Sequence, residues 1–189
     1  SGAALVRAGW SKDTIKAGTV VIFEGNPPRD PTAKGLLIDS FTMPDDSNDP
    51  RLLYPVLLAL DENIAGRLRR HDCLARRFSV WGRYLKFTGG FDKQSTLAAP
   101  THDALTLCEA AWRIIERGAR VKPLRALGLQ THDLVWSAGV PLPVWPADYK
   151  RLKALTALDQ INNRYGEHTI VPATLLNLKL DRHVSGFKP

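Results

Sequence analysis

Polar and basic side chains recur at alternate positions in the middle of the chain, in a pattern that suits contact with phosphate. Between residues 78 and 85, apolar residues alternate with Ser79, Trp81 and Arg83. Because successive side chains of a strand point to opposite faces, this alternation predicts a strand with one buried and one polar face. We expect Arg125 and Lys93, on two later predicted strands, to join them. Guanidinium, ammonium and hydroxyl groups on one face would form a polar, basic surface of hydrogen-bond donors, which suits an anionic partner.

Acidic and metal-ligating residues offer a second kind of chemistry, which the sequence favours less. Asp45, Asp46 and Asp49 lie close together and could bind a cation, but turn formation and helix capping explain aspartate at these positions without a metal. His71 and Cys73 are the closest pair of zinc-ligand types, and two further ligands at zinc spacing are missing. We therefore expect no metal site in this chain.

The charge of the chain favours a polyanionic partner. Lys and Arg number 26 against 19 Asp and Glu, which gives a net charge of +7 and a pI of about 9.6. Residues 1–50 hold 5 basic and 7 acidic side chains, whereas residues 51–100 hold 9 and 4, so the positive charge is concentrated. A binding face for nucleic acid needs such a concentration, although an ordinary basic protein remains the alternative on charge alone.

Cysteine content and hydropathy predict the compartment. Cys73 and Cys108 are the two cysteines, and they form neither a disulfide framework nor a metal-ligand pair. No apolar run approaches the roughly 20 residues that cross a bilayer, and the start of the chain lacks the features of a signal peptide. We expect a cytoplasmic protein that has no membrane partner.

The periodicity predicts an α+β fold. Strands are expected at 36–43, 78–85, 93–98 and 124–135. One helix should run from Pro50, capped by Asp49, to about Arg70, and a second should start near Pro100 and Thr101 and end at Gly118. The order βαββαβ places both helices on one face of a four-stranded, mainly antiparallel sheet and leaves the other face open. The second helix should point these residues inward: Leu105, Cys108, Trp112 and Ile115.

The chain divides into three predicted parts. Residues 1–34 hold a helix at 4–17, a strand at 19–23 and a Pro-rich linker at 25–31, and they stay unassigned. Residues 35–137 form the central domain. Residues 138–189 form an extension with a Pro-rich stretch and a third helix at about 147–165, which Gly166 ends.

Six short segments follow one another in an order that resembles the little-finger domain, the C-terminal domain of Y-family translesion DNA polymerases of the DinB and UmuC type. The resemblance covers about residues 36–170, and no single segment is specific. The segments are 38–44, 67–71, the strand containing Arg83 and Tyr84, 96–101, 123–129 and 159–166. Residues 1–34 match poorly the end of the thumb domain that precedes the little finger in that family.

The resemblance implies a role in DNA repair, damage tolerance and the SOS response. The open sheet face would hold primer-template DNA through its phosphates, without reading sequence. Arg83 and Arg125 match the family pattern and are the principal candidates, while Trp81 either stacks on a base or packs against a neighbour. Further candidate contacts are Lys86, Lys93, Ser40, Thr42, Ser95 and Thr96.

Two other groups of arginines and the catalytic chemistry are expected elsewhere. Arg67, Arg69 and Arg70, followed by Arg76 and Arg77, are expected on the helix-covered side and away from DNA. Polymerisation in the family uses palm-domain carboxylates that bind two Mg²⁺ ions. This chain has no room for a palm, so we expect no catalytic residue and no cofactor in it.

The stretch before the third helix resembles the peptide with which bacterial members of the family bind the sliding clamp. Leu142, Val144 and Trp145 keep its apolar pattern, whereas Pro141 stands where a glutamine is usual. The alternative is that Leu142 and Trp145 pack onto the domain. Two rival functions remain: an adapter for the clamp with incidental DNA affinity, and an RNA-binding module, which lacks its usual aromatic strand motif here.

Overall fold

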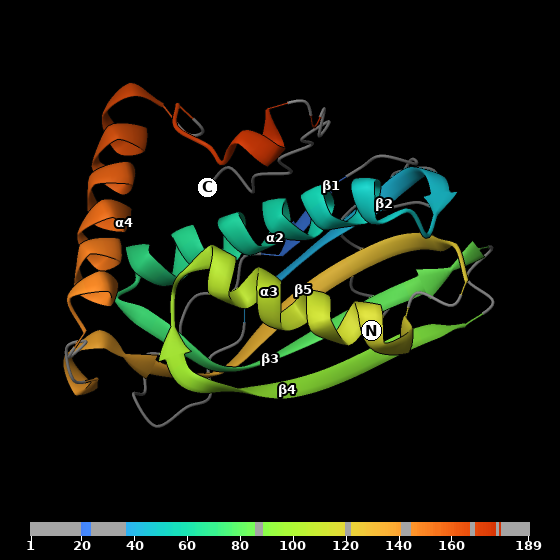
Figure 1. Ribbon diagram of the computed structural model, residues 1–189, viewed down its shortest axis with the longest axis horizontal. Helices are drawn as coiled ribbons and strands as arrows, with labels where there is room; N and C mark the ends of the chain where they lie inside the picture. Colours follow the sequence, from blue (N-terminus) through green and yellow to red (C-terminus); the bar gives the residue numbers. More distant parts are fainter. Residues whose placement is uncertain are drawn as a thin grey trace, which may run out of the picture.

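The computed structural model describes residues 20–23, 37–85, 89–119, 122–140, 145–166, 169–176 and 178. The predicted helix 4–17 and linker 25–31 lie outside these residues. The fold is α+β, with the predicted order of elements around an antiparallel sheet (Figure 1). The strands are β1 (Val20–Phe23), β2 (Leu37–Ser47), β3 (Cys73–Tyr84), β4 (Gly90–Thr101) and β5 (Leu124–Trp136).

The sheet has five strands in the order β1-β2-β5-β3-β4. The four predicted strands form it as expected, and β1 adds a fifth at the edge, beside β2. Residues 20–23 therefore share a sheet with the central domain, although they precede the predicted boundary near residue 34. That boundary stays a prediction.

Two helices cover one face of the sheet: α2 (Pro50–Arg70) and α3 (Ala104–Ile114), which continues into a π-helical turn at Ile115–Ala119 (Figure 1). The predicted cap of α2 is confirmed, because Asp49 Oδ1 accepts a hydrogen bond of 2.9 Å from the amide of Arg51. In contrast, α3 begins at Ala104 rather than near Pro100, because β4 runs on to Thr101 and Asp103 provides the cap.

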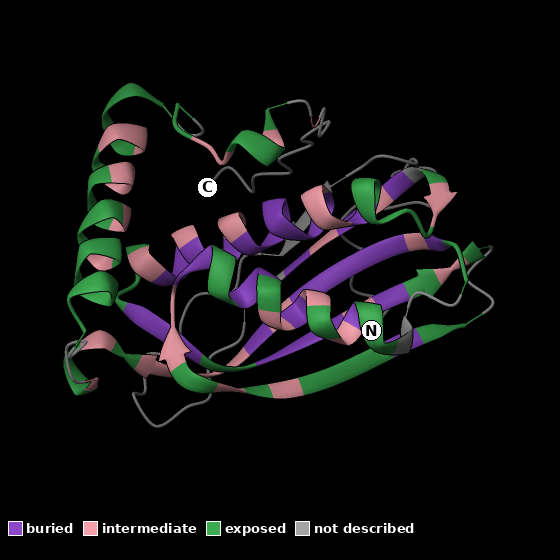
Figure 2. Cartoon of the chain, in the orientation of Figure 1, coloured by how far each residue is buried: buried purple, intermediate pink, exposed green. Residues whose placement is uncertain are grey.

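The core lies between these helices and the sheet (Figure 2). Cys108 and Ile115 of the second helical segment are fully buried, as predicted, but Leu105 is 37% exposed. Leu107 and Ala111 take the inward positions instead. Leu105 lies at the edge of the buried stripe that Ala104, Leu107, Cys108 and Ala111 form, and the predicted stripe was therefore rotated around the helix axis.

The third predicted helix is α4 (Pro146–Tyr165), and Gly166 follows it as expected. None of its residues is buried, and it lies across one end of α2 (Figure 1). Two ion pairs hold it there. Arg69 of α2 donates two hydrogen bonds to Asp159, of 2.6 and 2.8 Å, and Arg151 Nη2 lies 2.7 Å from Asp103 Oδ2. No helix in the described residues is long and apolar enough to cross a membrane.

Asp61 is a buried carboxyl group on α2. Its residue is fully buried, and neither of its oxygens has a hydrogen-bond partner within the described part of the chain. Burial raises the pKa of Asp61 well above its ordinary value, although the nearby thiol of Cys108 opposes part of that rise. The fold therefore favours the protonated, uncharged form of this carboxyl group.

Candidate nucleic-acid interface

The register between β3 and β5 decides which side chains point away from the helices. Val80 pairs with Leu129, and both are fully buried on the helix-covered side. The next residue, Trp81, pairs with Gly128 and therefore lies on the opposite side, which we call the open face. The same alternation and pairing place on the open face Ser40, Thr42, Arg77, Ser79, Arg83, Asp92, Gln94, Thr96, Gln130 and His132.

Arg83 and Trp81 form one unit on the open face. The indole of Trp81 lies directly over Gly128, where a Cβ atom would stand 2.2 Å from the ring. The guanidinium carbon of Arg83 is 5.7 Å from the centre of that ring. On its other side, Arg83 approaches Gly90, where a Cβ atom would be 3.1 Å from Nη1. The guanidinium of Arg83 is thus exposed to solvent, while it contacts the ring of Trp81 on one side and the backbone of Gly90 on the other.

Two roles are considered for Trp81: stacking on a base of DNA, or packing against neighbouring residues. Its ring covers the backbone of the neighbouring strand, and the residue is half-buried rather than fully exposed. A packing role against Gly128 and Arg83 therefore accounts for the geometry. Ser40 and Thr42, which pair with Gly128 and Ala126, lie on the same face as this unit.

Arg125 differs from Arg83 in having an internal partner. It is the extra residue where the register of β5 with β3 shifts between Arg83 and Tyr84. Its Nη1 lies 3.6 Å from Asp46 Oδ1, and both side chains are partly buried. Arg125 lies on a strand as predicted, but an incoming phosphate would have to compete with Asp46 for it.

Lys93 and Ser95 lie on the helix side of β4, so their predicted place on the open face is wrong. Lys93 pairs with Val80 and Ser95 with Phe78, both of which point into the core. Lys93 is nevertheless exposed, because β4 is an edge strand. Thr96, one residue further along, pairs with Arg77 and does lie on the open face.

Arg77 lies on the open face, contrary to the expectation that it faces the helix-covered side. It pairs with His132 of β5 and with Thr96 of β4. Ser79 Oγ and His132 Nε2 share a hydrogen bond of 2.8 Å, and Gln130 Nε2 lies 3.5 Å from His132 Nδ1. Burial lowers the pKa of His132, and the charge of Arg77 lowers it further, whereas Asp92 raises it.

Sequence reasoning missed Arg77, Gln130 and His132 as members of this face. The signal for Arg77 was present, because Arg77 continues the alternation of Ser79, Trp81 and Arg83 by one more step. The two residues of β5 had no such signal. Their face depends on how β5 aligns with β3, and that alignment is not local in sequence.

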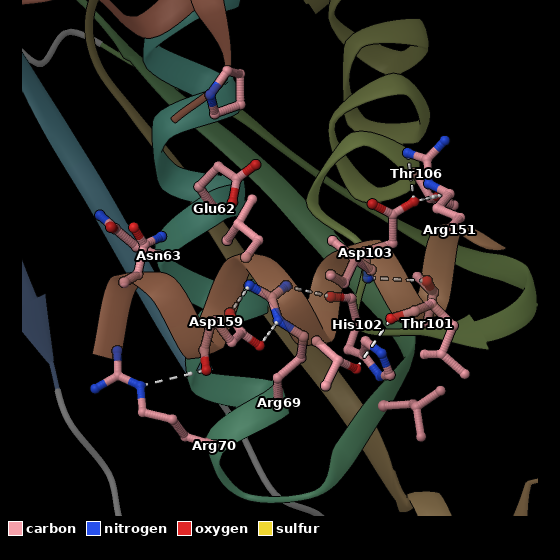
Figure 3. A pocket seen from close by; sticks show the side chains of 18 of the residues that line it. Glu62, Asn63, Arg69, Arg70, Thr101, His102, Asp103, Thr106, Arg151 and Asp159 are labelled. Atoms are coloured by element: carbon pink, nitrogen blue, oxygen red, sulfur yellow. Dashed lines mark hydrogen bonds and ion pairs between the residues drawn. The ribbon is translucent and has the colours of Figure 1, made fainter. Parts of the chain in front are cut away.

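A groove lies on the helix side, between α2, the end of β4 and α4 (Figure 3). This groove has a volume of about 1350 Å³. Its arginines are engaged with groove carboxylates or backbone: Arg69 binds Asp159 and the carbonyl oxygen of His102, and Arg151 binds Asp103 (Figure 3). Arg67 also lies away from the open face, because it is a residue of α2 and only 7% of it is exposed.

The remaining predicted residues are placed as follows. Trp145 precedes α4 and is 72% exposed. Lys86, Leu142 and Val144 lie outside the described residues, so the proposed contacts through them stay predictions. Asp49 caps α2, and Asp46 forms an ion pair with Arg125. Within the described ranges, no group of three or more His, Cys, Asp or Glu side chains is placed to hold a metal ion.

Two bacterial DNA polymerases are similar to this chain in sequence. The chain is 30% identical over 123 residues to DNA polymerase IV 2 of Bacillus subtilis (strain 168), a match that covers 64% of this chain and 30% of that protein. It is 29% identical over 129 residues to DNA polymerase IV of Desulfatibacillum aliphaticivorans, covering 65% of this chain and 32% of that protein. The matched region therefore spans about a third of either polymerase.

Two solved structures are similar at low sequence identity. One is a complex of beta-clamp processivity factor and little finger domain of PolIV, with a TM-score of 0.43, 16% identity, and coverage of 59% of this chain and 94% of that chain. The other is an insertion ternary complex of Dbh DNA polymerase, with a TM-score of 0.44, 15% identity, and coverage of 59% and 32%.

The family model described as the impB/mucB/samB family C-terminal domain matches residues 37–142, which run from the start of β2 past the end of β5. This span is more than half of the chain and includes both helices that cover the sheet. The chain therefore belongs to the impB/mucB/samB C-terminal domain family, the little-finger domain of Y-family DNA polymerases.

Proposed function

We propose that this chain binds primer-template DNA through the phosphate backbone, independently of base sequence, as the DNA-holding part of an error-prone translesion polymerase in DNA damage tolerance. The observation that carries the proposal is the Arg83 unit: an exposed guanidinium, supported by Trp81 and Gly90, on a sheet face that α2 and α3 leave uncovered. The hydroxyls of Ser40, Thr42 and Thr96 lie on the same face.

The chemistry of this face fits a phosphate contact better than a base contact. Arginine donates up to five hydrogen bonds in a fixed planar fork and keeps its charge at any physiological pH. A grip through phosphates tolerates any sequence and a distorted template, which a polymerase that copies damaged DNA requires. Nucleotidyl transfer itself would be supplied by other parts of a longer polymerase, since the match covers about a third of each named relative.

The test is fluorescence anisotropy of the chain with two primer-template duplexes of unrelated sequence, titrated across salt. Arg83→Ala should lower the slope of log Kobs against log salt by about 0.9, the contribution of one phosphate contact, on both duplexes. Arg113→Ala is the matched control, because Arg113 is an exposed arginine on α3, on the helix-covered side. Absence of binding at low salt, or equal slopes for the two variants, would refute the proposal.

A second function, docking to a sliding clamp, is favoured by Trp145. A tryptophan that is 72% exposed just before a helix is free to insert into an apolar pocket of a partner. Trp145→Ala should then abolish binding to the bacterial clamp in surface plasmon resonance while DNA affinity stays unchanged. If clamp binding is equal in the wild type and the variant, Trp145 is not the anchor.

A further inference from the structure

We infer that the open face carries a second phosphate-binding site, formed by Arg77 and His132, with Ser79 orienting the imidazole, and separate from the Arg83 unit. The inference rests on the proposed function, because it assigns a further contact to the same DNA-binding face. Its geometry is independent of Arg83, however, and so is its test.

Three strands bring the donors of this site together. Arg77 of β3 lies between Thr96 of β4 and His132 of β5, which are its direct partners across the sheet. Side chains directly opposite each other in antiparallel strands have Cβ atoms about 5 Å apart. Ser79, two residues along β3, shares a hydrogen bond of 2.8 Å with His132 Nε2, which orients the imidazole. The guanidinium of Arg77, the imidazole of His132 and the hydroxyl of Thr96 therefore lie side by side on the open face, while the buried hydroxyl of Ser79 holds the imidazole.

The charge of Arg77 is available to an external anion. In the described part of the chain, Arg77 makes no ion pair and no side-chain hydrogen bond, and its residue is exposed. Arg69, Arg125 and Arg151 each have a carboxylate partner instead. A cation that the protein does not neutralise gains most from a phosphate, because no internal contact has to break first.

The imidazole adds a component that depends on pH. Burial and the charge of Arg77 lower the pKa of His132, while Asp92 on β4 raises it; Ser79 and Gln130 are its uncharged neighbours. The lowered pKa favours the neutral form of His132 in the free protein. A phosphate beside it favours the protonated form, so binding should take up a proton and strengthen as the pH falls.

The two sites are too far apart to share one phosphate. Arg83 lies six residues beyond Arg77 on the same strand, which corresponds to about 20 Å at roughly 3.3 Å per residue. Contacts at that separation, with no shared partner, should contribute additively to DNA affinity.

The test compares Arg77→Ala with Arg113→Ala, which removes an equal charge from an exposed residue of α3. Arg113 lies on the helix-covered side of the sheet and is therefore the matched control. With a primer-template duplex, Arg77→Ala should lower the salt slope by about 0.9, and the Arg77→Ala/Arg83→Ala double variant by about 1.8, whereas Arg113→Ala should leave it unchanged. Equal slopes for the Arg113 and Arg77 variants would overturn the second site.

That outcome is distinguishable from failure of the proposed function, which would appear as an unchanged slope in Arg83→Ala. A second variant, His132→Gln, tests the imidazole, with folding checked by thermal denaturation. Wild-type affinity should rise several-fold between about pH 7.5 and about pH 5.5, and this rise should disappear in His132→Gln. A rise that persists in full in His132→Gln would exclude His132 from the site.

Discussion

The open face and the groove beneath α4 both contain arginines, yet they differ in how those charges are balanced. In the groove, Arg69 and Arg151 are bound by Asp159 and Asp103, and they fasten α4 to the rest of the fold. On the open face, Arg83 contacts an aromatic ring and is otherwise exposed to solvent. The number of arginines in a segment therefore says little about DNA binding. What matters is whether a carboxylate of the same chain already neutralises each one.

Removal of a groove arginine should affect stability and not DNA binding. Arg69→Ala should destabilise the fold by about 2–3 kcal/mol, because it leaves the Asp159 carboxylate and the His102 carbonyl without their partner. The free energy of unfolding in urea measures this loss. The salt slope of DNA binding should not change. A reduced slope in the folded variant would show that the groove, too, binds DNA.

The carboxyl group of Asp61 is kept neutral by a proton, whereas those of Asp159 and Asp103 are paired with arginines. Its folded pKa is raised, so its contribution to stability is greatest below its ordinary value of 3.8 and is lost as the pH rises toward the folded pKa. Asp61→Asn should therefore gain stability over the wild type by about 1.4 kcal/mol for each pH unit across this window. Urea denaturation of both proteins at several pH values measures the gain. A pH-independent difference between them would show that Asp61 does not titrate in this range.

Trp81 should contribute to DNA binding through its contact with Arg83. Trp81→Leu should weaken duplex binding by about 0.5–1 kcal/mol, the contribution of an exposed cation–π contact. The same substitution should have no further effect in the Arg83→Ala background, and Trp81→Phe should restore part of the loss. Anisotropy titrations of the four combinations measure this coupling. A loss that persists without Arg83 would mean that Trp81 itself stacks on the DNA.

Asp46 offers the smallest expected effect. Asp46→Asn should remove the carboxylate that lies 3.6 Å from Arg125 and so raise the positive potential around that guanidinium, which keeps a further contact inside the chain. The salt slope of DNA binding should then increase, by less than the roughly 0.9 of a full phosphate contact. No change in slope, in a folded variant, would show that Asp46 does not oppose phosphate binding at Arg125.

Features fixed by neighbouring residues were predictable from the sequence. The cap of α2 by Asp49, the end of α4 at Gly166 and the order of strands and helices all follow from local patterns. The faces of Lys93 and Ser95 were not, because the phase of β4 relative to β3 depends on how the chain turns between them. Asp159 and Arg69 meet across 90 residues, and no local signal foretells that contact.

NMR of the chain with duplex DNA would show directly which surface binds the duplex. A short duplex of either sequence should shift the signals of Arg77, the Trp81 indole N–H, Arg83 and Gln130, all of which lie on the open face. The signals of Arg69, Arg151 and Asp159 in the groove should stay in place. Shifts confined to the groove, with the open face unchanged, would show that DNA does not bind to the open face.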